Sequence, residues 1–193
     1  AVVRLCQRAI EIDPNYARAW SLMAGAQGSL RLHLARAGDG GMAASERALA
    51  LDPNLAEAHA ARAGFLTISG DYEGARPAVE RALQLDPESY EVNVAAARFY
   101  YSTRNMESAI RHFEKAATLM ASDYWAAGML MPCYAAIGDT ESVKRAAVRA
   151  LARAERAVAQ DPGSCSAMSF AITALSPLSQ LERAKEWAER ARL

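Results

Sequence analysis

Apolar residues recur along the chain with the spacing of amphipathic helices, and the helical segments end at turns that share a mark. Four turns carry the dipeptide Asp-Pro, and an apolar helical stretch precedes each one. The four dipeptides are Asp13-Pro14, Asp52-Pro53, Asp86-Pro87 and Asp161-Pro162. Their prolines lie 39, 34 and 75 residues apart, and the last interval divides into 34 and 41 when Ala121 takes the place of a missing proline. This recurrence predicts an internal structural repeat.

A second mark lies between successive prolines. It occurs at Gly70-Asp71, Arg104-Asn105, Gly138-Asp139 and, more weakly, Gly38-Asp39. Glycine suits the left-handed residue that ends a helix, and Asp or Asn caps the helix that follows. A glutamate then falls in the first helical turn, where the helix dipole favours an anion; these are Glu73, Glu107 and Glu141. Each repeat is therefore predicted to be a helical hairpin.

This pattern resembles the tetratricopeptide repeat over nearly the whole chain. The small residue at which the two helices of a hairpin touch is present as Ala24, Ala63 and Ala97, then Met131 and Ile172. The bulky position of the first helix holds Trp20, His59, Asn93, Ala127 and Met168. The resemblance implies an all-α fold, a right-handed superhelix of antiparallel helical hairpins.

We expect a single array over residues 1–193 that opens with a half repeat. The half repeat is 1–14, full repeats are 15–53, 54–87, 88–121 and 122–162, and the last, truncated repeat is 163–193. The chain starts without Met inside a helical pattern, which indicates a piece of a longer protein. Two repeats are each seven residues longer at one helix. Seven residues are about two helical turns, so we expect protruding helices around Ser29–Ala37 and Arg145–Glu155.

Composition sharpens this picture. Alanine supplies 44 of 193 residues, which favours helices over strands. Lys and Arg number 22, as do Asp and Glu, so a chain without net charge is not expected to bind nucleic acid. No apolar run approaches the roughly 20 residues of a membrane span, and we expect no membrane insertion. The chain has an odd number of cysteines, Cys6, Cys133 and Cys165, and we expect them to be reduced in a cytoplasmic protein. They fall on helical faces, where cysteine is commonly buried.

Residues that could perform chemistry are not grouped in the sequence. His33, His59 and His112 have no partner at a metal-binding spacing. Neither a Ser/His/Asp pattern nor a Gly-x-Ser-x-Gly motif occurs. The glycine cluster at 38–41 is not followed by the Gly-Lys-Ser/Thr of a phosphate loop. We therefore expect no enzyme activity, no cofactor and no metal in this chain.

Solenoid arrays bind partners on an extended concave surface, and the resemblance places the first helix of each hairpin along it. The large side chains predicted to line this groove are Leu22, Ile68, Arg98, Tyr101, Trp125, Met129 and Phe170. Small residues around them would let a guest backbone approach, and the apolar groups would anchor it. The alternative interpretation is that these residues only pack hairpin against hairpin.

A row of arginines on one helix face is a second candidate surface. Arg145, Arg149 and Arg153 are spaced by four residues. They would contact an acidic partner, or they form a solvated outer face.

The sequence thus predicts a non-catalytic protein-interaction scaffold that binds a peptide, a helix or a neighbouring domain in its concave groove. The alternative is a structural array that associates with itself through its exposed ends. The last quarter, from Arg149 to Ala191, is similar to arrays behind the catalytic domain of bacterial class III adenylate or guanylate cyclases. That resemblance implies a regulatory part of a bacterial signalling protein.

Overall fold

The computed structural model describes residues 2–34 and 41–191, and the side chains of 2–28 and 41–191. All regular structure in the described part is α-helical, which confirms the predicted fold class. The chain divides into two compact units, Ala1–Asn105 and Met106–Leu193. Each unit is described by itself, and the single array of repeats stays a prediction.

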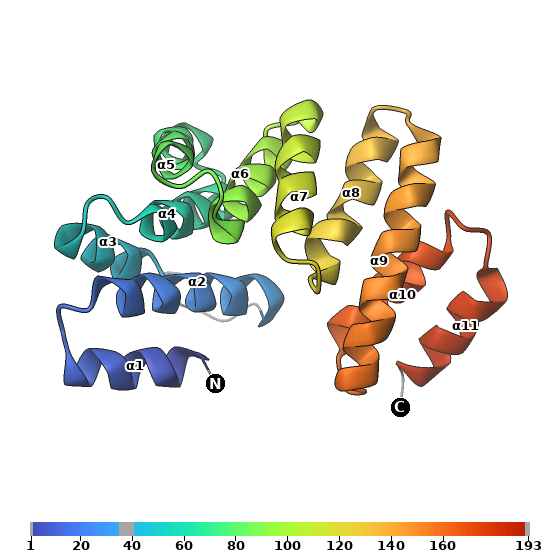
Figure 1. The fold of residues 1–193 in the computed structure, drawn as a ribbon, viewed down its shortest axis with the longest axis horizontal. Helices are drawn as coiled ribbons and strands as arrows, with labels where there is room; N and C mark the ends of the chain where they lie inside the picture. The colour runs from blue at the N-terminus through green and yellow to red at the C-terminus, as the bar shows by residue number, and fades with distance from the viewer. Residues whose placement is uncertain (1, 35–40, 192–193) are drawn as a thin grey trace. The chain divides into compact units, whose positions relative to one another are not determined.

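The described residues of the first unit form six helices (Figure 1, blue to green). They are α1 (Val2–Ile12), α2 (Ala17–Leu34), α3 (Met42–Leu51), α4 (Ala56–Ser69), α5 (Tyr72–Leu85) and α6 (Tyr90–Ser102). Helices α2 and α3 pack as one hairpin and α4 and α5 as the next. The first helices also lie side by side, α2 against α4 and α4 against α6.

In the second unit, the part of the chain that the structure describes forms five helices (Figure 1, yellow-green to red). They are α7 (Met106–Leu119), α8 (Tyr124–Ala136), α9 (Thr140–Gln160), α10 (Cys165–Leu175) and α11 (Leu181–Arg190). Helices α8 and α9 form one hairpin and α10 and α11 another, while α8 also packs on α7 and on α10.

The Asp-Pro turns have one local geometry. In each, the aspartate carboxylate accepts a hydrogen bond from the backbone N–H two residues later, at 2.9–3.1 Å. The donors are the N–H groups of Asn15, Asn54, Glu88 and Gly163. This Asx turn, with the fixed φ of proline, ends one helix and starts the approach to the next.

The predicted bulky position has a polar role in the first unit. Trp20 Nε1 donates to the carbonyl of Pro14 at 2.9 Å, and Asn93 Nδ2 donates to the carbonyl of Pro87 at 2.8 Å. His59 Nε2 lies 2.9 Å from the carbonyl of Pro53, and only the tautomer protonated at Nε2 can donate there. Three different side chains thus form a hydrogen bond to the equivalent proline carbonyl in three successive turns. The bulk of these side chains did not indicate this role.

The second set of marks also has the predicted geometry. Gly70 and Gly138 have φ values of 83° and 77°, and Arg104 has a φ of 62°. The side chains of Asp71 and Asp139 accept hydrogen bonds from backbone N–H groups three residues later. The turn after α10 carries no such mark, and there Ser179 adopts the left-handed conformation with a φ of 57°.

The two predicted long helices are longer than their equivalents. Helix α9 has 21 residues against 14 in α5 and α7, so the predicted extension of seven is confirmed. The expected protrusion of Arg145–Glu155 is wrong, because Ala147, Ala150 and Ala154 are fully buried and α9 packs against both α8 and α10. Helix α2 has 18 described residues; the rest of Ser29–Ala37, like Gly38-Asp39, lies outside the described residues.

Alanine forms most of the buried core, which lets the helices approach closely. At Gly41, where α3 begins, an added Cβ would lie 2.4 Å from the carbonyl oxygen of Ala24 on α2. Cys6 and Cys133 are buried as predicted, whereas Cys165 is exposed because it is the first residue of α10, outside the packed face.

We expect His59→Leu to lower the free energy of unfolding by about 1 kcal/mol, because the Pro53 carbonyl loses its protein donor and keeps only water. His59→Asn should retain most of the stability, since Asn93 makes the equivalent bond. Urea unfolding at pH 7, followed by circular dichroism, measures both. Equal midpoints for His59→Leu and the wild type would show that this bond contributes nothing.

Candidate functional site

In the first unit, the predicted groove residues lie on the neighbouring helices α2, α4 and α6. Leu22 of α2 is 58% exposed. Ile68, Arg98 and Tyr101 are each partly exposed. We call these four residues the first-unit face.

Two glycines in the same helices leave backbone uncovered. A Cβ added at Gly25 of α2 or at Gly64 of α4 would meet no atom within 4 Å. The two positions are equivalent in successive repeats, 39 residues apart. A helix-interior glycine costs roughly 1 kcal/mol relative to alanine, so these positions keep an open surface at some expense of stability.

Arg98 is the one cation among the four residues of the first-unit face. Burial lowers the pKa of its guanidinium below the ordinary value, yet arginine remains protonated. The methylene groups of its side chain add to the apolar surface of the face, and only the guanidinium group at the end carries charge. The face is therefore mainly apolar.

In the second unit, the predicted groove residues are engaged in packing between helices. Trp125 contacts the buried Phe113 edge to face, with ring centroids 5.6 Å apart. Phe170 of α10 lies 5.5 Å from the ring of Tyr124 on α8. Met129 is partly exposed on α8.

Phe170 also covers Gly128 of α8. A Cβ added at Gly128 would lie 2.3 Å from Cδ1 of Phe170, so the absence of a side chain there makes room for the ring. For Trp125 and Phe170, the packing interpretation therefore accounts for the contacts observed. Both remain partly exposed, and their binding role stays a prediction.

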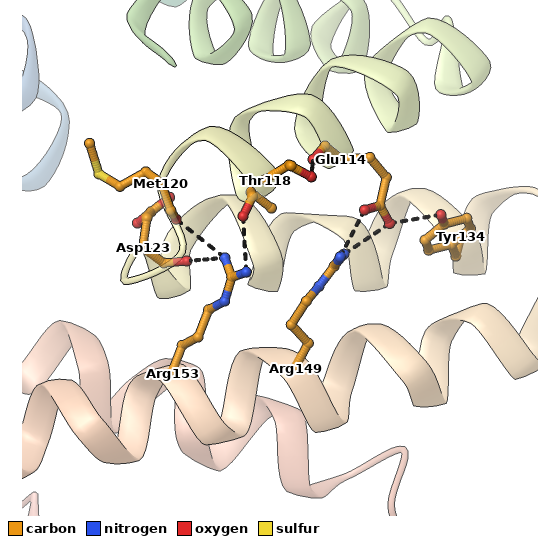
Figure 2. Close-up of polar contacts among 8 residues, drawn as sticks. Glu114, Thr118, Met120, Asp123, Tyr134, Arg149 and Arg153 are labelled. Atoms are coloured by element: carbon orange, nitrogen blue, oxygen red, sulfur yellow. Dashed lines mark hydrogen bonds and ion pairs between the residues drawn. The ribbon is translucent and has the colours of Figure 1, made fainter.

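The predicted basic row separates into different environments on α9 (Figure 2). Arg149 forms a two-pronged ion pair with Glu114 of α7, at 2.8 and 2.9 Å. Arg153 is buried and points at backbone carbonyls. Arg145 is exposed and donates to the hydroxyl of Ser142 at 2.6 Å. Two of the three cations are thus used inside the unit.

Glu114 is the centre of a small polar cluster that the sequence analysis missed. Tyr134 of α8 donates its hydroxyl hydrogen to Glu114 at 3.0 Å, beside the Arg149 pair (Figure 2). Burial opposes ionisation of Glu114, but the hydrogen bonds and charge of Arg149 outweigh it and hold the pKa of the carboxyl below its ordinary value. Burial, with the Glu114 charge, raises the pKa of Tyr134 to about 12. A charge pair separated by about one repeat is the sequence feature that could have indicated this cluster.

A pocket of about 180 Å³ lies against the same cluster. Its lining residues are Glu114, Tyr134, Ser142, Arg145, Ala146 and Arg149. The Ser142 hydroxyl donates a hydrogen bond to the carboxylate of Asp139. The cations that line the pocket therefore face hydrogen-bond acceptors that belong to the chain itself. Within the described residues, no group of His, Cys, Asp and Glu side chains is arranged to hold a metal ion.

Arg153 supplies donors to the turn that lacks the Asp-Pro mark. Its guanidinium donates to the carbonyls of Ala117 and Asp123 at 2.9 Å, and to that of Met120 at 3.4 Å (Figure 2). These carbonyls lie at the end of α7 and in the turn to α8. A cation at a helix C-terminus also interacts favourably with the helix dipole.

Comparison with known proteins supports the repeat assignment. Residues 66–114 match the model of the tetratricopeptide repeat. No curated protein matches the sequence of the chain. The structural similarities described next, together with the helical hairpins, show that the chain has the all-α solenoid fold of tetratricopeptide-repeat proteins.

Three solved structures illustrate that likeness. YrrB, described as a TPR protein with an unusual peptide-binding site, is 20% identical over 96% of this chain and 90% of its own, with a TM-score of 0.54. MamA is 19% identical over 79% of this chain and 85% of its own, with a TM-score of 0.56. The human IFIT1 dimer with m7Gppp-AAAA is 17% identical over 98% of this chain but 45% of its own, with a TM-score of 0.74. This chain thus corresponds to less than half of IFIT1.

Within the described residues, no helix is long and apolar enough to cross a membrane.

The Phe170 contact predicts opposite effects for two glycine substitutions. Gly128→Ala should lower the free energy of unfolding by about 1–3 kcal/mol, because the new methyl group overlaps the Phe170 ring. Gly64→Ala, the matched control, should raise it by about 0.5–1 kcal/mol, because the methyl group meets no atom and alanine favours the helix. Denaturant unfolding of both variants tests the prediction, which fails if the two shifts have the same sign.

The Glu114 cluster predicts a stability difference that depends on pH. The pKa of the Glu114 carboxyl is lowered in the folded state. The stability that the ionised carboxyl contributes is therefore fully present above the ordinary pKa of a glutamate and is lost as the pH falls through the folded-state pKa. Glu114→Gln should therefore cost on the order of 1 kcal/mol at pH 6, with allowance for solvent screening, and much less at pH 3. Urea unfolding at both values measures this.

Glu80→Gln is the control for that experiment. Glu80 is an exposed residue in the interior of α5, away from the first turn, so the loss of its charge should cost little at either pH. An equal cost of Glu114→Gln at pH 6 and pH 3 would contradict the assignment of the charged pair.

Proposed function

We propose that the chain is a non-catalytic scaffold that binds protein partners, taking a peptide or helix on the faces formed by its first helices. The observation that carries this proposal is the first-unit face. There, Leu22 of α2 is 58% exposed, and Ile68 of α4 and Tyr101 of α6 are partly exposed, on helices of which α2 lies against α4 and α4 against α6.

The chemistry of this face favours an apolar ligand with an accessible backbone. Gly25 and Gly64 leave room for a guest main chain, and Leu22 and Ile68 offer apolar contacts. Burying apolar surface of this kind contributes roughly 25 cal/mol per Å² before the costs of association. Arg98 provides one cation that could orient a carboxylate or carbonyl of the ligand.

The balanced charge of the chain disfavours two other ligand classes. Nucleic-acid binding depends on clustered cations, and two arginines of the predicted basic row form contacts within the second unit. A strongly acidic peptide would meet few cations on the first-unit face. The likeness to YrrB, a TPR protein with a peptide-binding site, agrees with a peptide as partner.

The broader context proposed for this scaffold is a regulatory part of a larger signalling protein. It rests on the similarity of the last quarter to arrays in bacterial nucleotide cyclases. Under this proposal, the catalysis belongs to another domain and the array positions or regulates it. The competing function is a structural array whose contacts run through its ends.

Site-specific photocrosslinking tests the face. Leu22→p-benzoylphenylalanine places the crosslinker on the first-unit face, and Val148→p-benzoylphenylalanine is the matched control, since Val148 is 57% exposed on α9. In lysate of the source cell, position 22 should crosslink to another protein several-fold more than position 148.

The identified partner then allows a quantitative measurement. Leu22→Glu should weaken its binding about tenfold in titration calorimetry, because a charge replaces an apolar contact. Equal crosslinking at both positions, or affinity unchanged by Leu22→Glu, would overturn the groove assignment. Crosslinks only between copies of this chain would favour the structural array instead.

A further inference from the structure

The pocket beside Glu114, which we call the Glu114 pocket, contains a cation that pairs with no carboxylate. Arg145 is exposed on α9, and its guanidinium donates a hydrogen bond to the hydroxyl of Ser142 at 2.6 Å. Among the residues that the structure describes, Arg145 forms no ion pair. Glu141, which lies one helical turn earlier on α9, pairs with Lys144 instead. Within that part of the chain, the guanidinium of Arg145 is therefore bonded to a neutral group alone.

The hydrogen-bond acceptors of the Glu114 pocket are already occupied. The carboxylate of Glu114 accepts two hydrogen bonds from Arg149 and one from Tyr134. The oxygen of Ser142 accepts from Arg145. A guanidinium carries five N–H donors, and this bond uses one of those of Arg145. The unused hydrogen-bonding capacity of the pocket therefore consists mainly of donors, which favours a ligand that accepts hydrogen bonds.

The charge of the lining also favours an anion. Glu114 and Arg149 neutralise each other as an ion pair (Figure 2), and Arg145 is the remaining charged residue of the lining. Asp139 lies outside the lining and is bonded to Ser142, whose hydrogen bonds lower the pKa of this aspartate more than the charge of Arg145 does. The lining thus carries one positive charge that its own residues do not neutralise.

The same cluster shows how such a cation is satisfied. Arg149 binds both oxygens of Glu114, which comes from α7. Arg145 lies one turn before Arg149, so the two arginines project from the same side of α9. The residue one turn before Glu114 on α7 is Ile110, so α7 supplies no second carboxylate at that position. A carboxylate from outside the chain would give Arg145 the kind of partner that Arg149 already has.

The size of the Glu114 pocket suits the end of an acidic side chain. Its volume is about 180 Å³, whereas a single water molecule needs roughly 10–15 Å³. Ala146, which is 2% exposed, contributes no more than a methyl group to the lining. The pocket therefore has room for the carboxylate of an Asp or Glu side chain.

We propose that the Glu114 pocket binds the carboxylate of an acidic side chain on a protein partner, and that Arg145 is its counter-ion. The planar guanidinium presents paired donors that match the two oxygens of a carboxylate. The ion pair of Glu114 with Arg149 forms a fixed wall beside the ligand. This surface belongs to α7, α8 and α9, so the proposal does not depend on ligand binding at the first-unit face.

An NMR titration of the full chain tests the proposal. The probe is a blocked glycine pentapeptide with one central glutamate, and the control peptide has glutamine in its place, both at constant ionic strength. The backbone amides of Ser142 and Ala146 report on the pocket that these residues line. We expect saturable shifts with the glutamate peptide and at least about fivefold weaker binding of the glutamine peptide, which lacks the charge.

Variants of the chain identify the counter-ion. Arg145→Gln should weaken binding of the glutamate peptide at least about fivefold, and Arg145→Lys should weaken it less, because lysine keeps the charge but not the paired donors. Arg111→Gln is the matched control and should bind as the wild type does. Arg111 is exposed on α7 and donates to Ser108 at 3.0 Å, as Arg145 does to Ser142, but it does not line the pocket. Circular dichroism checks that each variant is folded.

The opposite results would overturn the proposal. Shifts that do not saturate, or that are equal for the two peptides, would show that the pocket does not bind a carboxylate. Equal weakening by Arg145→Gln and Arg111→Gln would show a general effect of charge in place of a site. Inorganic phosphate is the second probe, and tighter saturation of the same amides by phosphate would assign the pocket to that anion instead of an acidic side chain.

Discussion

The first unit depends on one recurring requirement, which is that carbonyl groups exposed at a turn receive hydrogen-bond donors. A proline turn ends each helix but removes a backbone donor at the same point. Trp20, His59 and Asn93, six residues after the prolines, satisfy the carbonyls with side-chain N–H groups. The next helix is thereby connected to the turn that precedes it, so the bond sets where that helix begins. The requirement is for a donor of suitable reach, which explains why an indole, an imidazole and an amide serve equally.

In the second unit, the turn after α7 meets the same requirement from a different helix. Its turn after α7 has Ala121 where proline is expected, and the position six residues later is Ala127, which has no donor. Arg153 of α9 reaches the carbonyls of that turn instead. A buried arginine needs its hydrogen bonds to be stable, so the turn and the cation stabilise each other. This mutual dependence explains why a residue in a basic row is unavailable to an outside partner.

The alanine core makes the exposed large side chains informative. Helices that touch through alanine and glycine bury little surface per residue, so aromatic rings and leucines are concentrated at a few contacts. Phe113, Phe170 and Trp125 fill the wider spaces of the second unit. Leu22 fills no such space and is 58% exposed, which is why it belongs to the face proposed to bind a ligand.

The sequence by itself determined the helices, most of their ends and the added length of α9, because those features follow from local chemistry. Proline, left-handed glycine and capping aspartate act on residues only a few positions away, and Asp71 and Gly70 behave as their identities predict. The candidate face on α2, α4 and α6 was inferred from the repeat and stays a prediction.

Only the tertiary structure decided which side chains are used internally. Arg149 and Arg153 have the same spacing as a solvated row, yet their partners lie on α7 and in the turn that follows it. Cys165 follows the composition rule for buried cysteine but starts a helix outside the packed face. The physical reason is that burial depends on which neighbouring helix covers a given side.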